Sequence, residues 1–285
     1  QFKKYIVRGA RAGKEYKMNL DLKIVLPVVI AFCISVVLCP IVIPFLKKLK
    51  FGQFVRDDGP QAHLKKAGTP TMGGLIILLS LTITTLIYMK KYPDVLPVLF
   101  VTLGFGLIGF IDDYIKVVMK RSMGLHAWQK MLGQIVVTGV FAYYVEKYSD
   151  INNELIIPFL GKTVQLNSTL YVILLFFIVL GTVNGANFTD GLDGLASSVT
   201  VLIATFFAVV AVGTDSGVAP VACAAVGCLL GFLVYNVYPA KVFMGDTGSL
   251  ALGGFVAGTA YMMQMPLYII IVGFIYLTSL KYYQL

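Results

Sequence analysis

The chain has 285 residues, of which 58% are apolar and only 13% are charged, and its formal net charge is +9. Soluble domains carry about 25% charged and 45–50% apolar residues, so one soluble core cannot bury this much apolar surface. The same figures exclude a disordered, collagen-like or nucleic-acid-binding chain. They leave a polytopic membrane protein, in which the excess of positive charge belongs to basic loops.

Nine apolar stretches approach the roughly 20 residues that a membrane-spanning helix needs. Their apolar residues are continuous rather than alternating, which makes strands improbable and predicts helices, because helices satisfy their own backbone hydrogen bonds in lipid. We therefore expect an all-α, polytopic integral membrane helical bundle. The nine expected spans are Ile24–Leu46, Thr71–Met89, Val95–Ile111, Met131–Val145, Tyr171–Val183, Leu195–Val212, Pro220–Tyr238, Leu250–Met263 and Leu267–Leu280.

The charge of the loops predicts the orientation of the bundle. The loops 47–70, 112–130, 184–194 and 239–249 carry eleven Lys and Arg residues, whereas the loops on the opposite side carry four. By the positive-inside rule the first set faces the cytoplasm. The N-terminal tail disagrees, because it is basic and lies on the opposite side. We therefore treat residues 1–17 as an atypical or appended tail, and residues 18–285 as a single membrane domain.

Five carboxylates in the basic loops lie close to the ends of the expected spans. A single interfacial Asp is usually a helix cap, but adjacent carboxylates raise each other's pKa unless a cation neutralises them. Oxygen donors, in a chain with two His and no clustered Cys, favour Mg²⁺ or Mn²⁺ over zinc. We expect the five to converge on one cytoplasmic cleft: Asp112, Asp113, Asp190, Asp193 and Asp246.

Three glycine-punctuated segments complete the expected site. The first, GPQAHLKKAGTPTMGG at 59–74, contains Lys65 and Lys66, which either hold phosphate oxygens or anchor the loop at the membrane surface. The third, VFMGDTGSLALGG at 242–254, places Asp246 at a helix N-terminus, where an anion such as phosphate is stabilised. A phosphate or diphosphate ligand fits this setting, and a site at the membrane surface suits a reaction between a soluble nucleotide and a lipid phosphate.

The second segment, NFTDGLDGLA at 187–196, precedes an expected span. We expect Thr189 and Asp190 to cap that span. We also expect Asn187, Asp190 and Asp193 to share one face of a helical turn, because they recur every three residues.

At these motifs the sequence resembles the polyprenyl-phosphate N-acetylhexosamine-1-phosphate transferase superfamily, and from about Leu46 to Leu277 it is similar to the phospho-N-acetylmuramoyl-pentapeptide transferase branch. The resemblance implies a bacterial, multi-pass inner-membrane enzyme whose active site faces the cytoplasm. Such an enzyme uses Mg²⁺ to transfer the phospho-sugar of UDP-N-acetylmuramoyl-pentapeptide to undecaprenyl phosphate, giving lipid I and UMP for peptidoglycan synthesis. It also implies a homodimer.

The resemblance further implies roles for residues. Asp112 and Asp113 match the catalytic pair, and Asp246 matches the metal ligand. Phe243 is expected to stack on uracil. The polar active-site positions are Lys66, Thr71, Lys116, Lys130, Asn187, Asp190 and Asn236, and the nucleoside pocket is formed by Gly191, Leu192, Asp193 and Phe243.

The resemblance leaves several alternatives open. The family has ten spans and a run of histidines in its last cytoplasmic loop, whereas this sequence has only His63 and His126 and closes with TSLKYYQL. We therefore expect the C-terminal part to be incomplete, which puts the activity of the printed chain in question. The rival functions are a sister transferase that uses UDP-N-acetylglucosamine, a cation-coupled transporter and a catalytically silent binding protein. For the reaction itself, direct attack by the lipid phosphate competes with a covalent phospho-Asp intermediate.

Overall fold

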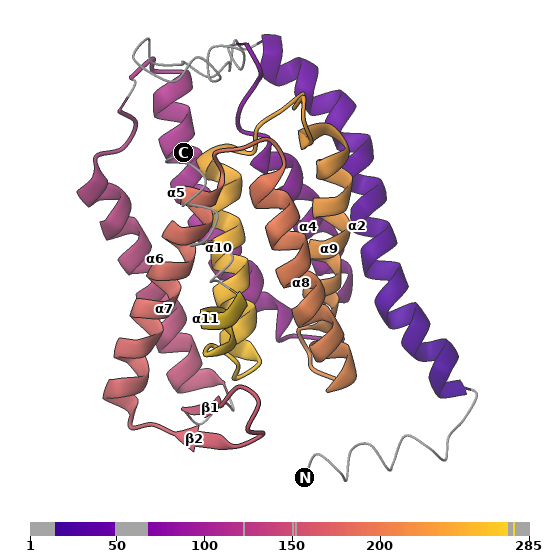
Figure 1. Cartoon of the computed structure of the whole chain (residues 1–285), viewed down its shortest axis with the longest axis vertical. Helices are drawn as coiled ribbons and strands as arrows, with labels where there is room; N and C mark the ends of the chain where they lie inside the picture. Colours follow the sequence, from indigo (N-terminus) through magenta and orange to yellow (C-terminus); the bar gives the residue numbers. More distant parts are fainter. Residues whose placement is uncertain are drawn as a thin grey trace.

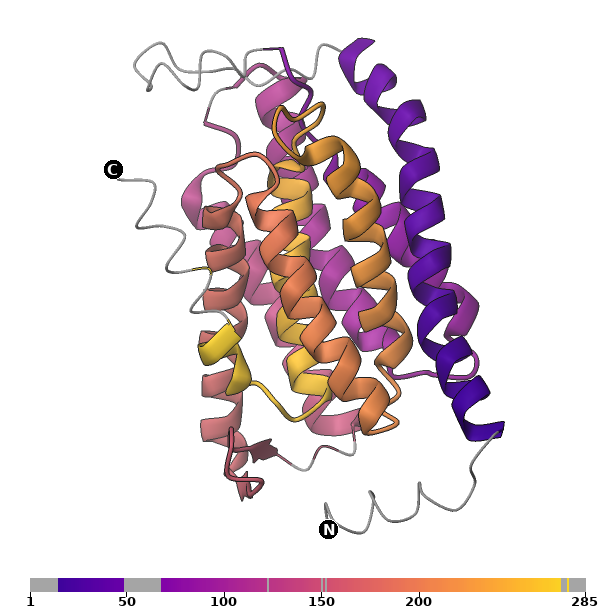
Figure 2. The same cartoon turned by 45° about the vertical axis from the view of Figure 1, so that its right-hand side comes forward.

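The protein is a bundle of helices that run side by side along its long axis (Figures 1 and 2). The computed structural model describes residues 15–48, 68–121, 123–149, 151, 153–272 and 276, with side chains from Val25 onward. The helices are α2 (Glu15–Lys48), α4 (Gly74–Tyr88), α5 (Val95–Val117), α6 (Ala127–Tyr148), α7 (Ser168–Thr189), α8 (Leu195–Gly213), α9 (Ala219–Asn236), α10 (Gly245–Met262) and α11 (Tyr268–Val272).

Each of the nine apolar stretches overlaps one of these helices, the ninth only over Tyr268–Val272, and the prediction of a helical membrane bundle is confirmed. By length and composition, five of the helices within the described residues can cross a membrane: α5, α7, α8, α9 and the part of α2 from Val25. Much of the ninth stretch, and of the tail at residues 1–17, lies outside the described residues. The long apolar runs predict the helices correctly, because a helix pairs its own backbone N–H and C=O groups and leaves none unpaired in lipid.

Helix α10 is the core of the bundle. Its residues from Thr247 to Tyr261 are all buried, and it packs between α5 and α7. Glycines make this packing possible: a Cβ at Gly74 of α4 would lie 2.2 Å from the backbone nitrogen of Gly248. Helix α2 lies along the outside of the bundle against α9, as both views show.

A two-stranded hairpin closes one end of the bundle, where no strand was expected. Strand β1 (Glu154–Ile156) pairs antiparallel with β2 (Thr163–Gln165), with Leu155 opposite Val164. The Ile156 N–H donates to the carbonyl of Gln264 just after α10, at 2.8 Å. The strands have three residues each, too few to produce a recognisable alternation of apolar and polar residues.

Two helix boundaries differ from the predicted spans in ways that affect the site. Helix α5 continues past the expected end at Ile111 to Val117, and Asp113 in this extension accepts hydrogen bonds from the start of α10. Helix α7 continues past Val183 to Thr189. Both extensions project helical polar side chains beyond the apolar part of the bundle, at the end opposite the hairpin (Figure 1).

Candidate active site

Three carboxylates meet where the C-terminal end of α5 crosses the N-terminus of α10. Asp112, Asp113 and Asp246 each offer an oxygen, and these three oxygens lie within 4.8 Å of one another. Glycine lets the helices approach this closely: a Cβ at Gly109, one turn earlier on α5, would lie 2.0 Å from the Asp246 carbonyl oxygen. The predicted convergence is therefore confirmed for three of the five carboxylates.

Asp113 caps α10. Its Oδ1 accepts the backbone N–H of Asp246 at 3.2 Å, and its Oδ2 accepts the backbone N–H and the hydroxyl of Thr247 at 2.8 and 2.6 Å. The residue at the N-cap position, Met244, has no side chain that can do this. A carboxylate at a helix N-terminus accepts hydrogen bonds from the unpaired N–H groups there and interacts favourably with the positive end of the helix dipole. Both oxygens of Asp113 are thus used in holding α10 to α5.

Asp112 faces the loop between α5 and α6 instead. Its Oδ1 accepts the backbone N–H of Leu125 at 2.7 Å, and its Oδ2 lies 2.5 Å from the ammonium nitrogen of Lys116, one turn later on α5. The loop can approach because residue 124 is glycine with a φ of +58°, and a Cβ there would lie 2.5 Å from Asp112 Oδ1.

Asp246 is the most heavily contacted of the three carboxylates. Its Oδ2 accepts from Lys116 at 3.0 Å and from Lys130 at 2.9 Å, and its Oδ1 accepts from the side-chain amide of Asn187 at 2.9 Å. Burial opposes ionisation of this carboxyl, but a hydrogen bond with Asp112 and the ammonium groups of Lys130 and Lys116 outweigh it. They hold the pKa of Asp246 far below its ordinary value. It is therefore an anion at every physiological pH.

Asn187 connects the carboxylate cluster to α6 and α7. It lies in the last turn of α7, where its amide also donates to the Ser249 hydroxyl at 2.8 Å and its Oδ1 accepts from Lys130 at 3.4 Å. In this cluster three carboxyl groups face the ammonium groups of Lys116 and Lys130. A cation would bind beside Asp246, the carboxylate whose pKa is lowered.

The turn between α7 and α8 differs from the prediction. Helix α8 has Gly194 at its N-cap, in the left-handed region, and neither Thr189 nor Asp190 caps it. Thr189 belongs to α7, where its hydroxyl donates to the Gly185 carbonyl, and Asp190 is the C-cap of α7. Because the helix ends there, Asn187 and Asp193 do not share a helical face.

The residues predicted for the nucleoside pocket lie in two neighbouring segments. Gly191, Leu192 and Asp193 form the turn after α7, and Asp193 Oδ2 accepts the backbone N–H of Ala240 at 3.0 Å, in the loop that follows α9. Phe243 lies further along that loop and is half-buried. The Asp193 contact thus brings the two predicted parts of the pocket together.

A second pairing fixes the loop that carries Phe243. The Phe243 N–H donates to the Pro70 carbonyl at 2.9 Å, and the Phe243 carbonyl accepts from Gly73 at 2.8 Å. Thr71 is buried between these contacts, and a Cβ at Gly245 would lie 2.8 Å from its hydroxyl oxygen. The segment 68–74 therefore lies against the start of α10.

Asn236 has a supporting position. It is buried, its Oδ1 accepts from the Ser197 hydroxyl at 2.8 Å, and its amide donates to the Val242 carbonyl at 2.9 Å. These bonds hold the residue before Phe243 against α8. Lys66, the remaining predicted site residue, lies outside the described residues.

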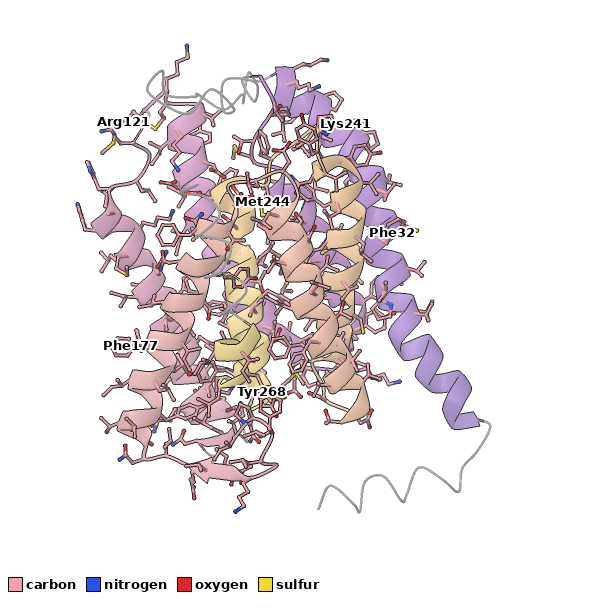
Figure 3. The ribbon with its side chains drawn as sticks, in the orientation of Figure 1. Phe32, Arg121, Phe177, Lys241, Met244 and Tyr268 are labelled. Atoms are coloured by element: carbon pink, nitrogen blue, oxygen red, sulfur yellow. The ribbon has the colours of Figure 1, made fainter. Side chains whose placement is uncertain are left out.

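Three polar residues of this region were missed by the sequence analysis. Ser249 contacts Asn187, while Gln134 and Asn184 bond to each other across α6 and α7. Spacing could have indicated the pair, because Gln134 lies one turn after Lys130, and Asn184 lies one turn before Asn187. Figure 3 shows Arg121, Lys241 and Met244 toward this end of the bundle, and Tyr268 toward the other.

The chain, a helical membrane bundle with carboxylates and lysines gathered at one end, matches the family described as glycosyl transferase family 4 over residues 95–264, which makes it a membrane-embedded transferase. It also matches signature 1 of phospho-N-acetylmuramoyl-pentapeptide-transferases over residues 66–78.

Relatives with that name align over most of the chain. The protein of Clostridium botulinum (strain Alaska E43 / Type E3) is 49% identical over 271 residues, which cover 94% of this chain and 82% of the relative. Those of Caldicellulosiruptor bescii and Bacillus subtilis (strain 168) are each 46% identical over 259 residues, which cover 90% and 89% of this chain and 80% and 79% of the relatives. The chain belongs to the phospho-N-acetylmuramoyl-pentapeptide-transferase family.

Proposed function

We propose that the protein transfers phospho-N-acetylmuramoyl-pentapeptide from its UDP-linked form to undecaprenyl phosphate, producing lipid I and UMP for peptidoglycan synthesis. The observation that carries the proposal is the position of Asp112 and Asp246 with two lysines at one end of a membrane bundle that has this family's signature. A lipid-linked acceptor and a water-soluble donor can meet only at such an end.

The charges of the site suit the two substrates. The attacking lipid phosphate is already largely anionic near neutral pH, so it needs charge neutralisation and in-line positioning more than deprotonation. Lys116 and Lys130 lie 3.0 and 2.9 Å from Asp246 and supply two mobile positive charges at the cluster. Released from Asp246 by a bound cation, their ammonium groups would contact phosphate oxygens.

The donor set of the cluster fits Mg²⁺. It consists of carboxylate oxygens, the hard ligands that Mg²⁺ prefers. Asp246 would hold the ion, and Asp113 is less available for it because it already accepts three hydrogen bonds from the start of α10. When bound, the ion neutralises the charge that the diphosphate develops as its bond breaks.

We infer direct attack by the lipid phosphate, with Asp112 accepting any remaining proton. Asp112 keeps one oxygen toward Lys116, whereas both oxygens of Asp113 are engaged by α10. The covalent alternative, in which an Asp attacks the donor first, predicts a phospho-enzyme. Rapid quenching with donor alone distinguishes the two, because only the covalent route releases UMP before acceptor is added.

The donor nucleoside is proposed to bind between the turn after α7 and the loop after α9. Phe243 would stack on uracil, and Asp193 would contact the base while its other oxygen holds Ala240. The pairing of Phe243 with Pro70 and Gly73 would keep the aromatic ring in place.

We further propose that this end of the bundle faces the cytoplasm of a bacterial inner membrane and that the protein forms a homodimer. The orientation is tested with Arg121→Cys and Phe159→Cys, two exposed positions, one near the site and one on the hairpin, in a background with the exposed Cys33 replaced by Ser. A membrane-impermeant thiol reagent added to spheroplasts should label position 159 and leave position 121 unlabelled. The reverse pattern would contradict the proposed topology.

The reaction itself is tested by incubating the full-length protein with undecaprenyl phosphate and each of two donors, UDP-N-acetylmuramoyl-pentapeptide and UDP-N-acetylglucosamine. Lipid-linked product should form only with the first donor and only with Mg²⁺ present. Product with the second donor would indicate the sister activity, and donor binding without product would indicate a silent binding protein. Either result would overturn the proposed function.

A further inference from the structure

A pair of side-chain amides joins α6 to α7 one helical turn below the carboxylate cluster. The Gln134 amide donates to Asn184 Oδ1 at 3.2 Å, and the Asn184 amide donates back to Gln134 Oε1 at 2.9 Å. The Asn184 amide also donates to the Leu180 carbonyl of its own helix at 2.8 Å. Gln134 is only 1% exposed. Polar pairs of this kind are directional, unlike the apolar contacts around them.

Each member of the amide pair lies one helical turn from a residue of the site. Lys130 precedes Gln134 by one turn on α6, and Asn187 follows Asn184 by one turn on α7, so the two pairs form successive rungs about 5.4 Å apart. The upper rung is the contact of Lys130 with Asn187, at 3.4 Å. Lys130 and Asn187 also each donate a hydrogen bond to the Asp246 carboxylate, at 2.9 Å.

Other buried hydroxyls in these two helices do not make such a connection. Thr138, one turn beyond Gln134, donates to the Gln134 carbonyl of its own helix at 2.7 Å, and Thr182 donates to the Ile178 carbonyl at 2.6 Å. Sliding or rotating α6 against α7 would leave these bonds intact. It would break the reciprocal amide pair and leave the buried Gln134 amide unpaired, which is costly, while Asn184 would keep only its bond to Leu180.

We propose that Gln134 and Asn184 form a positioning clasp, which fixes the register of α6 against α7 and thereby places Lys130 and Asn187 on Asp246. The clasp touches no substrate, and it acts through the two residues of the upper rung. This inference rests on the proposed transferase function, since its effect is read in that reaction. It adds two residues to the machinery of the site that neither the motifs nor the carboxylate cluster identify.

The first test separates positioning from folding by replacing both amides with Leu. Asn184→Leu leaves the buried Gln134 amide unpaired and should lower Tm by several degrees, whereas Gln134→Leu leaves the half-buried Asn184 with its Leu180 bond and should lower Tm less. The double variant leaves neither amide without a partner, because both amides are removed. Replacing both partners of a hydrogen bond by apolar groups is nearly neutral for stability. Its Tm should return close to that of the parent, while kcat stays about 10- to 100-fold lower, since small misplacements of a catalytic group have effects of this size.

The matched control is Thr138→Val, which removes a buried hydroxyl from the same helix without touching α7. It should keep the parental kcat. KM for the UDP-linked donor should change less than about threefold in the double variant, because Lys130 and Asn187 act at Asp246 rather than at the predicted nucleoside pocket. Recovery of kcat together with Tm would show an exclusively structural role and overturn the proposal, as would loss of both.

The second test asks whether the clasp acts through Lys130 and Asn187. In a background with both Lys130→Met and Asn187→Leu, measured with radiolabelled donor, the double Leu replacement of the clasp should lower kcat by less than about threefold, because both side chains that it positions are gone. An undiminished effect there would overturn the proposal. Failure of the parent protein to form lipid-linked product would instead refute the transferase function, whatever the clasp variants do.

Discussion

Replacing Asp113 by Asn tests whether this residue holds α10 in place. The substitution preserves size, but it exchanges one acceptor oxygen for an NH₂ group and removes the charge. Whichever way the amide is turned, the NH₂ group faces a donor, either the Asp246 N–H or the backbone N–H and hydroxyl of Thr247. The N-terminus of α10 then loses its only side-chain cap among the described residues.

The magnitude follows from those contacts. Hydrogen bonds to a charged group are worth about 1.5–3 kcal/mol each, and at least one is lost. The lost attraction between the carboxylate and the helix N-terminus adds roughly 0.3–2 kcal/mol. We expect Asp113→Asn to lower the free energy of unfolding by about 2–5 kcal/mol, which corresponds to a fall in Tm of about 3–8 °C in a chain of this size.

A thiol-reactive fluorescent dye measures this change in detergent. Cys39, Cys223 and Cys228 are buried and react only when the bundle opens, whereas Cys33 is exposed and is replaced by Ser to remove background. Heating the purified protein with the dye gives Tm for each variant in the same buffer.

Two variants frame the result. Thr247→Val removes only the hydroxyl bond to Asp113 and should cause a smaller fall in Tm. Asp112→Asn keeps an oxygen for the Leu125 N–H, so Tm should change little while activity falls steeply. If Asp113→Asn left Tm unchanged but removed activity as Asp112→Asn does, the capping role would be refuted and both residues would belong to the chemistry.

The remaining predictions concern the metal ligand, the nucleoside pocket and the helix contact at the site. Asp246→Asn should lower kcat by several orders of magnitude and shift the Mg²⁺ dependence. Asp193→Asn should instead raise KM for the UDP-linked donor about 10- to 150-fold. Steady-state kinetics with Mg²⁺ varied measures both effects, and finding each effect in the other variant would contradict both predictions. Gly109→Ala places a methyl group 2.0 Å from the Asp246 carbonyl and should lower stability by at least about 1–3 kcal/mol. Gly181→Ala, on α7 with nothing within 4 Å of the new methyl, should instead raise stability by about 0.5–1 kcal/mol, and equal Tm shifts for the two would refute the close approach of α5 to α10.

The existence of the helices was predictable, because a long apolar run in lipid forms a helix. The residues at which the helices end were not predictable. The span at Val95–Ile111 was ended where apolar residues stop, whereas α5 continues to Val117. Its last two turns are kept helical by partners from distant parts of the chain, such as the start of α10. The sequence near the end of α5 contains no information about such distant partners, and therefore it does not predict the end of the helix at Val117.

The site was predictable in its residue types and only partly in its geometry. Motif spacing and family resemblance identified Asp112 and Asp246, which are more than a hundred residues apart, as members of one site. The expected helical face of Asn187, Asp190 and Asp193 was wrong, because α7 ends at Thr189 and the glycine at 194 starts the next helix in a left-handed conformation. A period of three residues indicates a shared face only while the helix continues.

The different partners of Asp112 and Asp113 follow from helix geometry. Adjacent residues on an α-helix point about 100° apart, since a turn takes 3.6 residues. Where α5 packs against α10, the two carboxylates therefore take different partners, although one oxygen of each stays within 4.8 Å of an Asp246 oxygen. Asp113 meets the N–H groups of α10, and Asp112 meets Leu125 and Lys116. Asp113 thus holds α10 to α5, and Asp112 holds the loop that follows α5.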